Sequence, residues 1–143
     1  MFNPSRDQVR GLFFETWRKY RAAEPLAGIE ALAIDVILQH PEYHAVLSDV
    51  ERSRDRDYTD ETNPFLHMSL HLALEEQLSI DQPPGIVARW QALLAAKGDR
   101  HEALHEALEC LAHTVWQAQR DGAPPDADAY LRCLEAAARG RPD

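Results

Sequence analysis

Residues 63–81 read NPFLHMSLHLALEEQLSID, and the other helices are expected to gather around this stretch. Asn63 suits a helix cap, and Pro64 suits the first helical position, where the backbone N–H has no helical partner. Apolar side chains then fall on nearly every side of a helical wheel: Phe65, Leu66, Met68, Leu70, Leu72, Leu74 and Leu78. A helix that is apolar nearly all round is normally surrounded by other helices. The stretch therefore predicts a central helix over residues 64–81.

Two histidines, His67 and His71, lie within this apolar helix. Their spacing of four residues places both imidazoles on one face. Ionisable side chains in an apolar interior must be paired, neutralised or bound to a metal ion. We therefore expect both rings to be largely buried and to belong to a chemical site.

Helical periodicity recurs on both sides of this stretch. It predicts helices over 4–23 and 26–39, with a short turn after Pro41. It also predicts a short helix from Ile86 that Gly98 ends, a helix from the Asp99 cap to about Gln119, and a last helix after Asp126. Asn3, Asp99 and Asp126 are the predicted caps, and proline and glycine separate the segments. No strand pattern or internal repeat interrupts them. The expected fold is therefore all-α, a single-domain helical bundle over residues 1–143 with about five or six helices and helix 64–81 at its centre.

Two segments have few apolar residues to bury. Residues 48–62, SDVERSRDRDYTDET, are polar and charged, so we expect an exposed surface loop there. The C-terminal residues 139–143 are expected to fray.

Composition narrows the classes of partner. The formal net charge of −9 disfavours nucleic-acid phosphates and anionic membrane surfaces. A membrane-spanning helix would need about 20 consecutive apolar residues, and no such run occurs. The first ten residues, MFNPSRDQVR, do not resemble a signal peptide, so a cytoplasmic protein is expected. A protein partner and a homo-oligomer both stay open.

The chain has two cysteines, Cys110 and Cys133. In a reducing compartment they are expected to be small core residues with free thiols. A disulfide between them is the less favoured alternative.

Six of the seven histidines form three pairs with i,i+4 spacing: His40 with His44, His67 with His71, and His101 with His105. Helical i,i+4 spacing brings two imidazoles close enough to share a metal ion. The first two pairs follow apolar stripes, so they are expected to face the interior. In the third, His105 with Glu109 is the better combination, because His101 lies near the helix start.

Residues 101–105 spell HEALH and match the H-E-x-x-H pattern of zinc peptidases, with Glu102 as the base. Such enzymes normally take a third ligand downstream and hold substrate along a sheet edge, and the sequence offers neither. A zinc hydrolase is therefore the third hypothesis.

Several segments resemble one family. They are NPSRDQVR at the start, HPEYH at 40–44, residues 63–86, ECL at 109–111 and residues 116–131. The chain is similar to the bacterial domain-of-unknown-function family 1841 over nearly its whole length. The resemblance implies a small helical bacterial protein, and it implies no particular activity. The histidine-containing segments of that family fall on His40, His44, His67, His71, His105 and Glu109.

The favoured hypothesis is a helical bundle that binds one or two transition-metal ions. Its ligands are those six residues, His40, His44, His67, His71, His105 and Glu109. Mixed imidazole and carboxylate ligands suit zinc, iron or manganese. The main alternative is a non-catalytic interaction module whose histidines are hydrogen-bonded structural residues. Whether the protein is an enzyme is left open.

Overall fold

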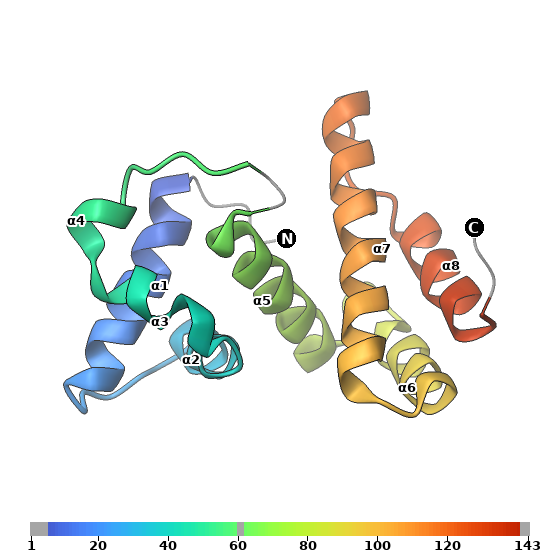
Figure 1. Ribbon diagram of the computed structural model, residues 1–143. Helices are drawn as coiled ribbons and strands as arrows, with labels where there is room; N and C mark the ends of the chain where they lie inside the picture. The colour runs from blue at the N-terminus through green and yellow to red at the C-terminus, as the bar shows by residue number, and fades with distance from the viewer. Residues whose placement is uncertain (1–5, 60–61, 141–143) are drawn as a thin grey trace. The chain divides into compact units, whose positions relative to one another are not determined.

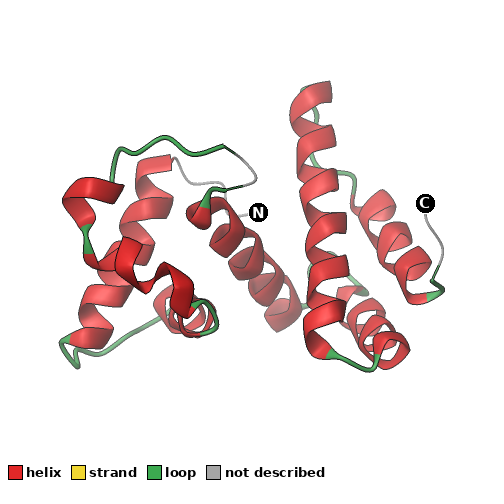
Figure 2. Ribbon diagram, in the orientation of Figure 1, coloured by secondary structure: helices red, strands yellow, loops and turns green. Residues whose placement is uncertain are grey.

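A computed structural model describes residues 6–59 and 62–140, and every regular element in these ranges is helical (Figure 2). The predicted all-α class is confirmed. The elements are α1 (Arg6–Arg21), α2 (Ile29–Leu38), the 3₁₀ helix η1 (Pro41–Tyr43), α3 (His44–Ser48), α4 (Val50–Ser53), α5 (Pro64–Ile80), α6 (Ile86–Lys97), α7 (Arg100–Asp121) and α8 (Ala127–Ala138). Short helices between residues 41 and 53 raise the count above the predicted five or six.

The chain divides into two compact units, residues 1–73 and 74–143. Helix α5 begins in the first unit and ends in the second (Figure 1). The single domain expected over residues 1–143 therefore stays a prediction, and each unit is described by itself.

The first unit has a core built by α1, α2, α3 and the first half of α5. Its buried apolar side chains are Phe13, Phe14, Trp17, Ala33, Ile34, Val36, Ile37, Leu47, Phe65, Met68 and Leu72. The rings of Phe14 and Phe65 meet edge to face with centroids 5.4 Å apart, so α1 packs against α5. An ion pair between Lys19 and Glu30, with an N–O distance of 2.9 Å, ties α1 to α2. The hydrogen bond from Lys19 lowers the pKa of the Glu30 carboxyl.

The polar segment 48–62 corrects one expectation. The segment contains the short helix α4. Arg10 of α1, which is only 4% exposed, holds the backbone at the end of α4 and just after it. The Arg10 guanidinium donates to the carbonyl oxygens of Ser53, Arg54 and Arg56 at 3.3, 2.8 and 2.9 Å. It also lies 4.7 Å from the centre of the Phe65 ring. A buried cation requires such partners, so most side chains here are exposed while the backbone is anchored.

The second unit contains the end of α5 and helices α6, α7 and α8, which pack pairwise against one another. The predicted caps Asp99 and Asp126 are confirmed, since their carboxylates accept from the backbone N–H groups of His101 and Ala129. Burial raises the pKa of Tyr130. Its hydroxyl donates to the Gln77 side-chain oxygen at 2.8 Å, which joins α8 to α5.

Cys110 and Cys133 form a disulfide bond between α7 and α8. The expectation of two free thiols was therefore wrong. The sequence could not reveal the bond, because residues far apart in the chain pair only if tertiary packing brings their Cα atoms close enough. Here they are 5.8 Å apart, a usual separation for a disulfide.

The predicted Asn3–Pro4 cap lies outside the described residues. Of the predicted frayed tail, residues 141–143 also lie outside them, whereas Arg139 and Gly140 form an exposed turn. Within the described ranges, no helix is long and apolar enough to cross a membrane.

Candidate metal centre

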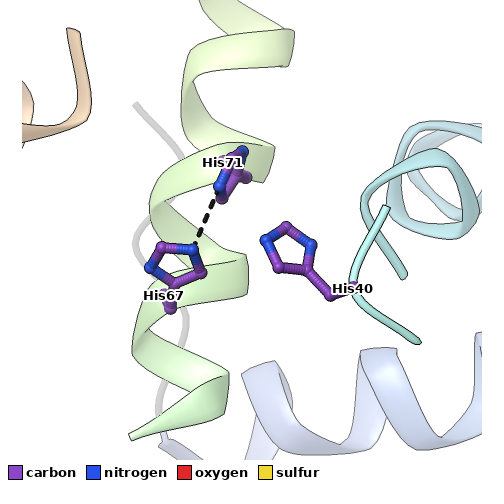
Figure 3. Close-up of side chains that lie close together, drawn as sticks. All are labelled: His40, His67 and His71. Carbon is purple, nitrogen blue, oxygen red and sulfur yellow. Dashed lines mark hydrogen bonds between the residues drawn. The ribbon is translucent and has the colours of Figure 1, made fainter. Parts of the chain in front are cut away.

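His67 and His71 are positioned by the first two turns of α5. The Asn63 side-chain oxygen caps the helix as predicted, accepting from the N–H groups of Phe65 and Leu66 at 3.0 and 3.1 Å. The helical spacing then brings the two Nε2 atoms to 3.2 Å from each other (Figure 3). His71 is 7% exposed and His67 is half-buried. Burial is therefore as predicted for His71 and less complete for His67.

His40 reaches this pair from the end of α2. His40 follows the C-cap Gln39 and precedes Pro41, so α2 has ended before His40. The imidazole is buried in the first unit. Its Nδ1 atom donates to the carbonyl oxygen of Val36 at 2.7 Å. This bond fixes the tautomer, because the remaining nitrogen, Nε2, then carries the lone pair. Figure 3 shows that nitrogen directed toward His67 and His71.

The three imidazoles form one cluster, which we call the histidine triad: His40, His67 and His71. Their rings meet edge to face, with the His40 centroid 5.0 Å from that of His67 and 4.6 Å from that of His71. One ligand nitrogen from each residue lies within 4.8 Å of the other two. Two nitrogens bound tetrahedrally to one zinc ion at 2.0–2.1 Å are about 3.3 Å apart. The His67–His71 separation of 3.2 Å is close to this value, and the ligand nitrogen of His40 lies within 4.8 Å of both.

His44 lies elsewhere in the same unit. Its Nε2 atom donates to the Ile37 carbonyl oxygen at 2.9 Å, and its ring stacks on Trp17 with centroids 4.3 Å apart. These contacts attach the turn that carries His40 to α1 and α2. The i,i+4 spacing of His40 and His44 predicts two ligands on one helix face. However, His40 precedes η1 and has non-helical backbone angles, φ −126° and ψ 64°, so the two rings do not share a helix face.

His105 and Glu109 are exposed residues of α7, in the second unit. Their participation in the triad stays a prediction. His101 is also exposed, and its ring centroid lies 5.6 Å from that of His105. Within the described ranges, the one metal-compatible group of three or more ligands is the triad, so HEALH has no third ligand there.

Two features of the site were not anticipated. One is the Val36 carbonyl that orients His40, because backbone acceptors leave no trace in a sequence. The other is Tyr43, whose ring stacks on His40 with centroids 5.5 Å apart. Burial, together with the nearby Glu42 charge, raises the pKa of Tyr43, so its phenol stays protonated at neutral pH. The HPEYH segment was the available signal for Tyr43.

No curated protein and no solved structure matches this sequence. Residues 5–136, in contrast, match the sequence profile of a family described as "Domain of unknown function (DUF1841)". The match covers both units and includes all three residues of the triad. This chain therefore belongs to the DUF1841 family.

Proposed function

We propose that this protein binds one transition-metal ion through the Nε2 atoms of His40, His67 and His71. The observation that carries the proposal is the convergence of three imidazole nitrogens within 4.8 Å, from two separate elements. The orientation of His40 supports it, since a backbone carbonyl on Nδ1 is the usual outer partner of a metal-binding histidine.

The competing hypothesis is a structural cluster of hydrogen-bonded histidines. One N–H···N bond accounts for the facing Nε2 atoms of His67 and His71. The bond to Val36 accounts for Nδ1 of His40. These two hydrogen bonds do not account for the direction of the His40 Nε2 atom, which faces two imidazoles (Figure 3). A shared cation accounts for all three directions at once.

The donor set suits zinc. Neutral imidazole binds zinc, copper, iron and nickel well, whereas manganese prefers carboxylate and water oxygens. The three proposed ligands are all imidazoles, so manganese is the least suited of zinc, iron and manganese. His40, His67 and His71 would hold zinc through three nitrogens, and the ion would supply Lewis-acid chemistry there. Any catalysis at the triad would therefore be of that class.

Chelation and pH test the proposal. Protein purified without an affinity tag and loaded with zinc should lose thermal stability when a strong chelator is added at neutral pH. The chelator effect should shrink at pH 5, because free imidazoles with a pKa near 6.5 bind protons in place of metal. The double variant His67→Ala/His71→Ala should show no chelator effect.

The control is His101→Ala/Glu102→Ala, which removes two exposed residues of the HEALH segment of α7 and keeps His105. This control should keep the full chelator effect, whereas a HEALH hydrolase would lose it. Equilibrium dialysis against zinc, iron and manganese gives the stoichiometry directly. Less than 0.1 equivalent of each metal bound, with a melting curve unmoved by chelator, would end the metal proposal in favour of the structural one.

A further inference from the structure

The two sulfurs of the Cys110–Cys133 disulfide have different surroundings. Cys110 is 4% exposed among the buried side chains of α7, whereas Cys133 of α8 is partly exposed. A surface groove of about 870 Å³ runs along residues of α7 and α8, and Cys133 lines it while Cys110 does not. A reagent in the groove therefore meets Cys133 first.

Two arginines without an ion-pair partner among the described residues, Arg132 and Arg139, also line the groove. The two acidic residues of the lining are already engaged. Asp121 accepts from Gln117 and lies 3.5 Å from Arg120, and Asp126 caps α8.

We infer that the groove is a thiol–disulfide exchange site, that Cys133 is the sulfur attacked, and that the co-reactant is a small thiol bearing carboxylates, such as glutathione. Arg132 and Arg139 supply the positive charge that would bind its carboxylates. The attacking form of the small thiol is its thiolate. The inference does not depend on metal binding, because it uses only residues of the second unit.

The exchange has two balanced steps. The thiolate attacks Sγ of Cys133, a mixed disulfide forms, and Sγ of Cys110 leaves as a thiolate that takes up a proton. A second thiolate then attacks the sulfur of the small molecule, and Cys133 is released as a thiolate. Two small thiols are thereby oxidised to one disulfide, and the protein disulfide is reduced to two thiols.

Single-cysteine variants test which sulfur reacts. Cys110→Ser leaves Cys133, and Cys133→Ser leaves Cys110, so each is the matched control of the other. With oxidised glutathione under native conditions, Cys110→Ser should form the mixed disulfide at least tenfold faster, as measured by intact-protein mass spectrometry. In 8 M urea the two rates should converge, because only folding distinguishes the thiols. Equal native rates, or a faster reaction of Cys133→Ser, would overturn the assignment of Cys133.

A second comparison tests the class of co-reactant. In the Cys110→Ser background, Arg132→Ala/Arg139→Ala should slow the reaction with oxidised glutathione several-fold. It should change the reaction with hydroxyethyl disulfide, which is neutral, by less than twofold. The same slowing with both reagents, or with neither, would overturn the preference for an anionic thiol. Circular dichroism of each variant verifies that the helices are retained.

Discussion

At the scale of single residues, His40 and His44 lie on one short turn and make different contacts. His40 turns its Nε2 atom toward His67 and His71, whereas His44 stacks on Trp17 and donates to the Ile37 carbonyl. In the proposed metal site, His40 would supply a ligand, whereas His44 anchors the turn. The two roles predict opposite consequences for substitution.

His40→Ala should lower zinc affinity at least 100-fold, because one of three ligands is lost. His44→Ala should lower it less than tenfold, while reducing the free energy of unfolding by about 1–3 kcal/mol through the lost stacking and hydrogen bond. Competition with a zinc-sensitive dye measures the affinity, and urea titration of the apo form measures the stability. Equal losses of affinity would show that His44 is a ligand, as the sequence first suggested.

At the scale of elements, pairs of helices are joined by specific polar or covalent links. In the first unit, Arg10 holds the backbone after α4 against α1. In the second unit, the disulfide joins α7 to α8, and an ion pair between Arg89 and Glu135 joins α6 to α8. The C-terminal helix α8 is therefore the element whose attachment depends most on the oxidation state.

Reduction of the disulfide should lower the free energy of unfolding by about 3 kcal/mol. The cysteines are 23 residues apart, and closing a loop of that size restricts the unfolded chain by about this amount. Urea titrations with and without a phosphine reductant measure the difference. The double variant Cys110→Ser/Cys133→Ser is the control and should not respond to the reductant. A wild-type midpoint that also fails to respond would show that the bond does not stabilise the fold.

At the scale of the whole molecule, α5 is the element that both units share. Its early residues Phe65, Met68 and Leu72 belong to the core of the first unit. Its later residues Leu74 and Gln77 belong to the second, where Gln77 accepts from Tyr130. Because one uninterrupted helix serves both, unfolding of α5 removes packed side chains from each unit.

We therefore expect both units to unfold together, as a single domain would. Hydrogen exchange at increasing urea concentration, read by mass spectrometry, should give the same midpoint for peptides from α1–α4 and from α6–α8. Peptides from α5 should follow the same curve. Two separate midpoints would mean that the units are independent domains and that the predicted single domain is wrong.

The sequence by itself determined the long helices and two of the three residues of the candidate site. Asn63, Asp99 and Asp126 fix helix starts through local hydrogen bonds, and the i,i+4 spacing fixes His67 beside His71, because both effects act within one or two helical turns. Only the tertiary structure decided that His40 completes the triad while His44 turns to Trp17, and that Cys110 bonds to Cys133. These pairings join segments far apart in the chain, so they depend on how the helices pack, which local spacing does not specify.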